Sequence, residues 1–576
     1  MKKRLSLFLL ALLVSSAVAQ TGNLRFTSNS TAGLPDLFGT LAPANFKPRI
    51  TSEIATKANF TGLDAFFTNV AYAGAVDPAA ATPWVGESWV NWNPQTATYA
   101  APTATLDGSY TGISATTING VDALEITSNL SLPAGVYSLP SNIFVRSGAT
   151  LTIAAGSVLR GVGTLVIQRG AKLIAAGTAT TPIVFTSANA AGSRAAGDNG
   201  GIVLLGRARN NNTNGNGFVE GFPEGNDASR YGYGDNSITQ DDQDSSGVLR
   251  YVRIEFAGKI LSPNNEINSL TLGGVGSKTV IDHIQCSWGK DDSYEWFGGT
   301  VNAKYLIAYA TSDDDFDTDR GFSGKVQFAL AVRDASTAES TAGESRGFES
   351  DNWVVASQFA NPRTTAVFSN VTLVGANLAG TQVGSATNGL GAGMQLRRNT
   401  SLRIYNSVVA GFVSLINLAD AETNNNYGNS QATLADSLLV FNNSVLIGST
   451  ANVFLRNGTN DAAAYQTGIA TRANLNYTQN AAAGLPSLFN TTLSNAQFQP
   501  QTSAQISTHA NFAGNLLEND AFFTTVNYIG AVPPAGTASW TEEAWVNWNP
   551  QTATYAAPTA TLDGSYTGIS ATTING

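Results

Sequence analysis

The residues best suited to carry chemistry are acids in two similar clusters, DDSYEWFGG at 291–299 and DDDFDTDRG at 313–321. Only 12% of the chain is charged, so this concentration stands out. A third stretch, GFESDNW at 347–353, repeats the mixture of acids and aromatics. Carboxylates gathered in this way can bind a hard cation, act as acid and base on a glycosidic bond, or hydrogen-bond the backbone of turns.

The spacing of the clusters decides which acids can meet. The stretches that begin at His283 and Tyr305 align without a gap at an offset of 22 residues, up to Gly299 and Gly321. This period fits one coil of a β-solenoid, in which equivalent residues of neighbouring coils lie about 4.8 Å apart. We therefore expect these residues to stack: Asp291 over Asp313, Asp292 over Asp314, Tyr294 over Phe316, Glu295 over Asp317, with Glu349 and Asp351 extending the rows of Asp317 and Asp319.

The first hypothesis for this acidic ridge is a Ca²⁺ site. Stacked carboxylates repel by roughly 1 kcal/mol per pair in water and by more at lower dielectric, so a cation would offset the repulsion. Four acids also alternate along DDDFDTD, which places them on one side of an extended segment. The spacing of an EF-hand loop is absent. The candidate ligands, which define the ridge, are Asp291, Asp292, Glu295, Asp313, Asp314, Asp315, Asp317, Asp319, Glu349 and Asp351.

Two other interpretations of the ridge stay open. A glycosidase or lyase would use a pair of the carboxylates, with Trp288, Trp296 and Trp353 stacking on sugars, and a lyase would need Lys290 or Arg320 as its base. Alternatively, the acids cap turns by accepting hydrogen bonds from backbone N–H groups. Turn capping explains Asp better than it explains Glu.

The composition favours an acidic, β-rich protein. The chain has 41 Asp+Glu against 31 Lys+Arg, which argues against nucleic acid or an anionic membrane as partner and favours cations or glycans. The 57 glycines, with abundant Ala, Thr, Ser and Asn, indicate strands and turns rather than helices.

The N-terminus predicts export. Three basic residues, the apolar run LSLFLLALLVSSAVA and an Ala-Val-Ala site before Gln20 are typical of a cleaved signal peptide, with an uncleaved anchor as the alternative. No later stretch is apolar enough to span a membrane. Cys286 is the single cysteine, so we expect neither a disulfide framework nor a lipid anchor at the cleavage site.

The two ends of the chain repeat each other. WVNWNPQTATYAAPTATLDGSYTGISATTING occurs at 89–120 and again at 545–576, and DAFFTNVAYAGAV at 64–76 resembles DAFFTTVNYIGAV at 520–532. We therefore expect five segments: a signal peptide at 1–19, an N-terminal module at 20–94, a parallel β-helix at 95–475, a related C-terminal module at 476–550, and a truncated repeat of 95–120 at 551–576.

Between the modules, short apolar strands recur with Gly, Asn and Asp turns, as in NIFVRSG, ATLTIAAG and TLVIQRG. No segment is suited to a crossover helix, which excludes α/β folds and leaves a sandwich or a β-helix. The coil-sized period favours the β-helix. The predicted fold is all-β, a right-handed parallel β-helix flanked by two related small terminal modules.

Four stretches resemble a family of secreted bacterial right-handed parallel β-helix proteins, many of which are described as surface lipoproteins: 197–206, 246–277, 291–328 and 394–412. The resemblance implies the fold and export, and no known reaction. Two departures are the module at the front of this chain and the absence of a lipidation cysteine.

The sequence thus predicts an exported structural or binding protein of the cell surface or the extracellular space, stabilised by Ca²⁺. Its expected partners are a second copy of itself, through the head and tail modules, or an extracellular glycan. The alternative is a polysaccharide lyase or glycoside hydrolase that acts through the acidic ridge.

Overall fold

The computed structural model describes residues 43–448, with gaps at 59, 61–62, 64, 119–120, 220–231, 236–239, 263–264, 340–343, 376–389, 422, 424–425 and 427–437. It also describes Leu34 and short stretches between 454 and 537. The predicted signal peptide at 1–19 and the repeat at 551–576 lie outside the described residues, as does most of the module at 476–550. Among the described residues, no helix is long and apolar enough to cross a membrane.

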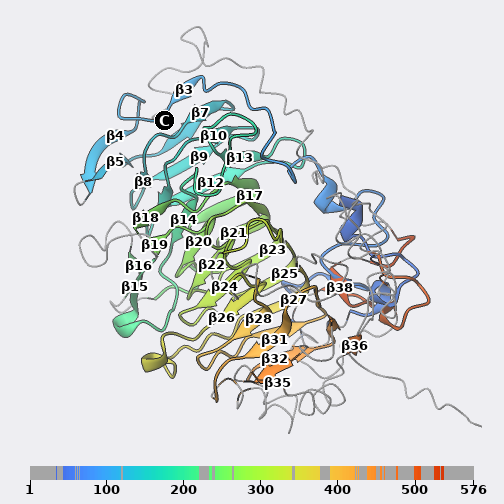
Figure 1. Cartoon of the computed structure of the whole chain (residues 1–576). Coiled ribbons are helices and arrows are strands. Elements are labelled where there is room, and N and C mark those ends of the chain that lie inside the picture. The colour runs from blue at the N-terminus through green and yellow to red at the C-terminus, as the bar shows by residue number, and fades with distance from the viewer. Residues whose placement is uncertain are drawn as a thin grey trace, which may run out of the picture.

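Sheet 1 is a single stack of strands that runs along the molecule (Figure 1). Neighbouring strands pair in parallel, except at the two ends, where β4 pairs with β5 and β35 with β34 in antiparallel fashion. In the described part of the chain it has 13 strands: β4 (Ser114–Ile118), β5 (Val121–Ile126), β8 (Ile143–Val145), β11 (Leu165–Ile167), β14 (Ile202–Leu205), β20 (Leu270–Gly273), β22 (Tyr294–Phe297), β24 (Phe316–Asp319), β26 (Phe348–Ser350), β28 (Ala392–Leu396), β31 (Ser414–Leu418), β34 (Phe454–Arg456) and β35 (Thr459–Asn460).

Sheet 2 lies opposite sheet 1, and all of its pairings are parallel. Its 17 strands in the described residues are β3 (Ala104–Thr105), β6 (Leu130–Leu132), β7 (Val136–Ser138), β9 (Thr150–Ile153), β10 (Val158–Arg160), β12 (Lys172–Ala176), β13 (Ile183–Thr186), β17 (Gly247–Glu255), β21 (Val280–Ser287), β23 (Asn302–Tyr309), β25 (Lys325–Val332), β27 (Val367–Val374), β29 (Arg403–Tyr405), β30 (Val408–Ala410), β32 (Val440–Asn442), β33 (Val445–Ile447) and β36 (Leu475–Tyr477).

The chain alternates between the two sheets, so each coil contributes to both. From β20 to β27, every even-numbered strand belongs to sheet 1 and every odd-numbered strand to sheet 2. Each strand pairs in parallel with its equivalent one coil later, for example β21 with β23 and β22 with β24. The predicted all-β parallel β-helix is therefore confirmed.

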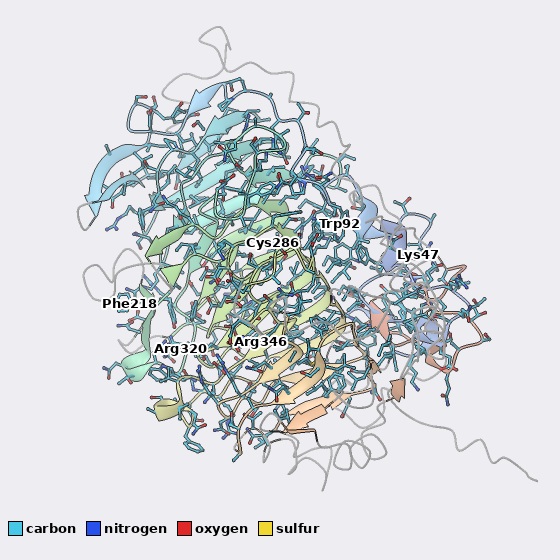
Figure 2. All side chains as sticks on the ribbon, in the orientation of Figure 1. Lys47, Trp92, Phe218, Cys286, Arg320 and Arg346 are labelled. Atoms are coloured by element: carbon cyan, nitrogen blue, oxygen red, sulfur yellow. The ribbon has the colours of Figure 1, made fainter. Side chains whose placement is uncertain are left out.

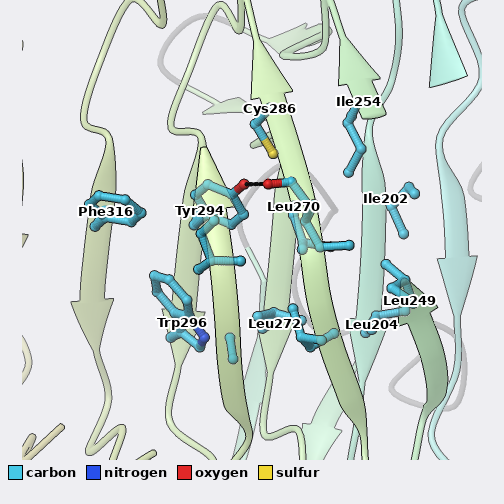
Figure 3. Close-up of a cluster of buried hydrophobic side chains, with 14 of the residues drawn as sticks. Ile202, Leu204, Leu249, Ile254, Leu270, Leu272, Cys286, Tyr294, Trp296 and Phe316 are labelled. Carbon is cyan, nitrogen blue, oxygen red and sulfur yellow. Dashed lines mark hydrogen bonds between the residues drawn. The ribbon is translucent and has the colours of Figure 1, made fainter. Parts of the chain in front are cut away.

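Apolar side chains fill the space between the sheets in columns along the axis (Figure 3). The ring of Phe316 stacks between Tyr294 at 5.5 Å and Phe348 at 5.1 Å. The Tyr294 hydroxyl lies 2.8 and 2.9 Å from the backbone carbonyl oxygens of Ile284 and Ile307, and its one proton is shared between these two acceptors, which satisfies the polar end of this buried side chain. Stacking in register thus lets each coil pack its aromatic rings on those of the next.

A bend with left-handed backbone recurs in sheet 2 at one position of each coil. Register places Tyr251, His283, Tyr305 and Phe328 in this row, followed by Asn370, Asn406 and Asn443, and all of them have positive φ. Asn tolerates this conformation well. For the bulky residues, stacking of their rings offsets the strain of positive φ: the ring separations are 4.4 Å for Tyr251 and His283, 4.2 Å for His283 and Tyr305, and 5.0 Å for Tyr305 and Phe328. The bend turns each coil toward its next face.

The N-terminal segment covers the outer face of sheet 2 (Figures 1 and 2). Trp84, Trp89 and Trp92 are buried in one cluster with residues of that sheet, so this segment shares a hydrophobic core with the β-helix. Trp84 and Trp89 meet the edge of His283, and Trp92 packs on Tyr309 at 5.0 Å.

The described parts of the head and tail pair with each other within the chain. Strands β1 (Asn69–Val70) and β2 (Ala73–Gly74) run parallel to β37 (Thr524–Thr525) and β38 (Gly530–Ala531). Tyr72 stacks on Tyr528, its counterpart in the repeated sequence, at 3.4 Å. The related sequences at the two ends therefore lie side by side.

The smaller elements complete the described structure. Two antiparallel pairs leave the β-helix, β15 (Asn216–Phe218) with β16 (Gly232–Gly234) and β18 (Ile260–Ser262) with β19 (Asn265–Glu266). The short 3₁₀ helices are Pro43–Phe46, Glu53–Thr56, Trp84–Gly86, Thr213–Gly215, Val355–Ser357 and Gln505–Ser507.

We expect Phe316→Ala to destabilise the protein by about 3–5 kcal/mol, because it opens a cavity in the stacked column. Val162→Ala, at a side chain that is 44% exposed, is the control and should change stability by less than about 0.5 kcal/mol. Urea unfolding followed by far-UV circular dichroism measures both. Equal losses in the two variants would contradict the packing described here.

Candidate functional site

The ridge acids that lie within strands of sheet 1 face outward because side chains alternate along each strand. In β22, β24 and β26, the residues at the first and third positions point into the interior. The second positions, Glu295, Asp317 and Glu349, therefore lie on the outer face. The strand register pairs Glu295 with Asp317 and Asp317 with Glu349, which confirms the predicted stacking.

This outer row changes character along the axis. After Glu125, which pairs with Arg146, its next members Phe144, Val166 and Val203 are apolar and packed with Val219 and Tyr233. Beyond this cover the same row continues as Thr271, Glu295, Asp317, Glu349, Gln395 and Asn417. The polar row thus begins where the hydrophobic cover ends.

Two of the aspartates cap turns. The Asp292 N–H donates to Asn268 Oδ1 at 3.1 Å, the Asp314 N–H to Asp292 Oδ1 at 2.8 Å, and the Arg346 N–H to Asp314 Oδ1 at 2.7 Å. Each side-chain oxygen therefore accepts a hydrogen bond from a backbone N–H of the following coil. The turn-capping interpretation is confirmed for Asp292 and Asp314.

A buried arginine pairs with Asp315 and keeps this carboxylate away from the other acids of the ridge. Arg333 Nε lies 3.1 Å from Asp315 Oδ2, and both side chains have no exposed surface. The rest of the guanidinium donates to the backbone carbonyls of Thr311, Asp313 and Arg346. Asp315 therefore does not share one side of the segment with Asp317 as the alternation predicted, because the chain bends before β24 begins and Arg333 holds this carboxylate beneath the turn.

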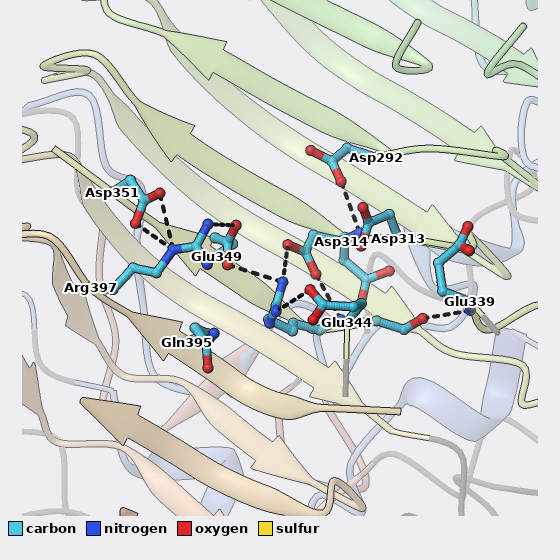
Figure 4. Close-up of polar contacts among 12 residues, drawn as sticks. Asp292, Asp313, Asp314, Glu339, Glu344, Glu349, Asp351, Gln395 and Arg397 are labelled. Atoms are coloured by element: carbon cyan, nitrogen blue, oxygen red, sulfur yellow. Dashed lines mark hydrogen bonds and ion pairs between the residues drawn. The ribbon is translucent and has the colours of Figure 1, made fainter. Parts of the chain in front are cut away.

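Other arginines neutralise the far end of the ridge (Figure 4). Arg397 bridges Glu349 at 2.5 Å and Asp351 at 2.8 Å, and Arg398 contacts Asp351 at 2.5 Å. Arg346 contacts Glu349 Oε1 at 3.0 Å as well as Asp314 and Glu344. Asp319 lies 3.3 Å from Arg320.

Five acids make two overlapping triads. Asp291, Asp292 and Asp313 form the first triad, and Asp292, Glu295 and Asp317 form the second. Within each triad the potential ligand atoms lie within 4.8 Å of one another. Asp292 and Glu295 are almost fully buried residues, with exposures of 6% and 5%.

Burial raises the pKa of several carboxyl groups of the ridge. Desolvation, followed by the charges of Asp314 and Asp291, raises the pKa of Asp313 to about 9. Desolvation and neighbouring acids also raise the pKa of Asp292 and the pKa of Asp317 well above the ordinary value. Desolvation raises the pKa of Glu349 to about 8 and the pKa of Asp315 to about 7, although arginines oppose the shift. A bound cation would reverse the electrostatic penalty.

The structure corrects two of the three tryptophan predictions. Trp296 is fully buried between the sheets and stacks on Phe322 at 5.3 Å, so it offers no surface to a sugar. Trp288 packs with Phe256 and Tyr309 in the cluster outside sheet 2, away from the ridge. Trp353 is half-buried beside the ridge, with the Arg320 guanidinium 4.7 Å from its ring.

Sequence reasoning missed the basic partners and the capping asparagine. Four arginines pair with the ridge acids but are far from the clusters in sequence or lie outside the aligned motif, so the period alone did not point to them. They are Arg333, Arg346, Arg397 and Arg398. Asn268 precedes β20 as the acidic clusters precede β22 and β24. Alignment of one further coil could have found it.

The fold defines the protein class as a parallel β-helix, with a row of polar side chains on the outer face of sheet 1. A family model described as a pectate-lyase-like beta helix domain matches residues 124–485, more than half of the chain. The chain belongs to this family. Comparison with curated proteins and with solved structures gave no match. The family description fits a structural or binding role as well as a polysaccharide lyase.

The raised pKa values predict how the cation-free protein responds to pH. A carboxyl group with a higher pKa in the folded state binds its proton more tightly there, so stability is lost as pH rises through the folded pKa. In the presence of chelator, we expect the melting temperature to fall as the pH rises from about 4, the ordinary pKa of aspartate, to about 9, the pKa of Asp313. Calorimetry across this range measures it.

Asp313→Asn, which fixes a neutral side chain, should flatten this pH dependence. A melting temperature that rises over the same interval would contradict the burial of the ridge acids.

Proposed function

We propose that the chain is an exported structural or binding protein of the cell surface or the extracellular space, in which Ca²⁺ completes the acidic ridge. The observation that carries this proposal is the pair of carboxylate triads centred on Asp292. Their acids come from two coils, so a cation bound there would clamp the coils together.

The donor set favours Ca²⁺ over transition metals. Every candidate donor in the two triads is a carboxylate oxygen, the ligand of hard cations, whereas zinc and copper sites favour His and Cys. Cys286 is buried between the sheets, and His283 lies beside Trp84 and Trp89 on sheet 2. Neither can contribute to the ridge.

An extracellular glycan is the partner that we assign to the outer face of sheet 1. The row from Glu295 to Asn417 offers polar side chains at successive coils, and Asn417 donates to Gln395 at 2.8 Å within it. Bound Ca²⁺ would bridge the row to an acidic sugar, and Trp353 supplies an aromatic ring beside it. Self-association through the head and tail modules stays a prediction. In such an assembly, β1 of one chain would pair with β37 of another chain instead of with its own β37.

We expect Ca²⁺ to raise the melting temperature by several degrees relative to chelator, because a ligand at about 100 times its Kd stabilises the folded state by roughly 2.7 kcal/mol. Asp317→Asn should remove most of the increase. Glu344→Gln is the matched control, since Glu344 pairs with Arg346 outside both triads and should retain the wild-type response. Differential scanning calorimetry makes the comparison, and an unchanged melting temperature in wild type contradicts the proposal.

The second candidate is a polysaccharide lyase or glycoside hydrolase, favoured by the family description and by the raised pKa of Asp317, which suits a general acid. A lyase base is harder to assign. Burial lowers the pKa of Arg346 and the pKa of Arg397, but their acidic partners outweigh it and raise both, so these guanidinium groups stay protonated.

A screen with pectins, alginates and neutral glycans separates the two candidates. We expect Ca²⁺-dependent retention of an acidic glycan on the immobilised protein, without new reducing ends and without the ultraviolet absorbance of the double bond that β-elimination creates. Cleavage that is lost in Asp317→Asn and in Glu295→Gln would establish the enzyme instead.

A further inference from the structure

We infer that the outer face of sheet 2 and the first coil of the β-helix bind residues 545–576 of a second copy of this chain. Residues 89–118 of the same chain occupy this surface, and residues 545–576 repeat 89–120 letter for letter. The inference rests on the self-association considered above, for which it names a surface, and it requires no cation.

The docked segment follows the β-helix along its axis toward the N-terminal end (Figure 1). It begins beside β23, where Trp92 packs on Tyr309, passes β21 and β17, and reaches β7. The contacts therefore extend over several coils, and the whole run of residues that makes them is present in the second copy.

Two tryptophans anchor the segment. Trp89 is fully buried and meets the ring of His283 edge-on at 5.6 Å, and Trp92, which is 1% exposed, packs on Tyr309 at 5.0 Å. A few buried aromatic anchors of this kind carry most of the binding energy of an interface. The second copy has both tryptophans at the same places in its sequence.

The surface also hydrogen-bonds the backbone of the segment. The Asn91 N–H donates to Gln285 Oε1 at 2.6 Å, and Gln285 Nε2 donates to the Asn91 carbonyl oxygen at 2.9 Å. Gln285 has no exposed surface. This pair of bonds fixes the position of the segment along β21, so a second copy with the same anchors would dock at the same residue.

The buried carboxylate of Glu255 indicates that the surface is built for this sequence. The Asn91 amide donates to Glu255 Oε1 at 3.1 Å, and the Tyr99 hydroxyl donates to Oε2 at 2.6 Å. Glu255 has no exposed surface, and it also contacts Thr186 at 2.8 Å and Arg253 at 3.6 Å. Loss of the segment would remove two donors from a buried carboxylate, which is unfavourable. The second copy supplies the same Asn and Tyr.

Two arginines hold the middle of the segment. Arg160 Nη1 donates to the Ala100 carbonyl oxygen at 3.0 Å, and Arg194 Nη1 donates to the Pro94 carbonyl oxygen. The Arg194 guanidinium also lies 4.8 Å from the centre of the Tyr99 ring. Both arginines come from the β-helix, so they would hold either copy in the same way.

The rest of the segment seals the N-terminal end of the β-helix. β3 pairs with β7, and β4 pairs with β5 at the edge of sheet 1. Leu106 and Ile113, which are 2% and 5% exposed, close the apolar interior at this end. One β-helix has one such end, and the described residues form one β-helix. The second copy of the capping sequence therefore fits the matching end of another molecule.

Exchange of one copy for the other keeps the contacts of the docked segment, because equal sequences make equal contacts. Within one chain, residues 89–118 lead directly into the β-helix, which gives them a high effective concentration at the surface. A second molecule therefore competes best with a segment that has been weakened by mutation.

The experiment mixes two purified full-length chains. The acceptor carries Trp89→Ala, Trp92→Ala, Trp545→Ala and Trp548→Ala, so both of its own copies lack their anchors, and the donor is the wild-type chain. We expect sedimentation velocity to show a one-to-one complex at micromolar concentrations. A donor with Trp545→Ala and Trp548→Ala, which keeps its own residues 89–118 intact, should bind the acceptor at least about 100-fold more weakly.

A change on the acceptor surface tests the same contact from the other side. Gln285→Ala in the acceptor should weaken the complex roughly tenfold, because it removes both hydrogen bonds to the donor backbone. Glu344→Gln, beside the acidic ridge, is the matched control and should leave the affinity unchanged.

A folded acceptor that stays monomeric beside the wild-type donor overturns the inference, and this includes the case in which residues 545–576 dock only within their own chain. A complex that survives Trp545→Ala and Trp548→Ala in the donor also overturns it, since another surface then holds the chains together. If circular dichroism shows that the acceptor is unfolded, Asn91→Ala with Asn547→Ala replaces its four changes, and the same outcomes apply. The response of the wild-type melting temperature to Ca²⁺ is measured separately, so failure here is distinct from failure of the proposed function.

Discussion

Stacking of successive coils in strict register is the constraint on which the rest of this structure depends. Parallel pairing sets each residue against its equivalent one coil later, so Tyr294 meets Phe316 and Phe316 meets Phe348. In the interior this repetition is favourable, because like rings stack. On the outer face the same rule forces Glu295, Asp317 and Glu349 into one row, where like charges repel.

The chain offsets this repulsion in different ways along the ridge. Asp292 and Asp314 cap the backbone of the next coil, Asp315 is paired with Arg333, and Glu349 and Asp351 are bridged by Arg397. The Oδ1 atoms of Asp313 and Asp317 accept no hydrogen bond in the described structure. The ridge is therefore neutralised by arginines at one end and holds uncompensated acids at the other, which is where we propose that a cation binds.

The sequence predicted the fold and the stacked acids because both follow from one period. An offset that aligns His283 with Tyr305 suffices to align Asp292 with Asp314. The same period could not show that Trp296 points inward, since placing a side chain inside or outside requires knowing where each strand begins. Nor could it place Arg333, whose contacts with the turn carbonyls depend on a bend between Asp313 and Phe316.

The most direct test of this account is the anomalous scattering of crystals grown with a lanthanide in place of Ca²⁺. The account predicts anomalous density between the carboxylates of neighbouring coils, bounded by Asp292, Asp313 and Asp317. Density confined to other parts of the molecule, with the ridge carboxylates bare at saturating lanthanide, would contradict it.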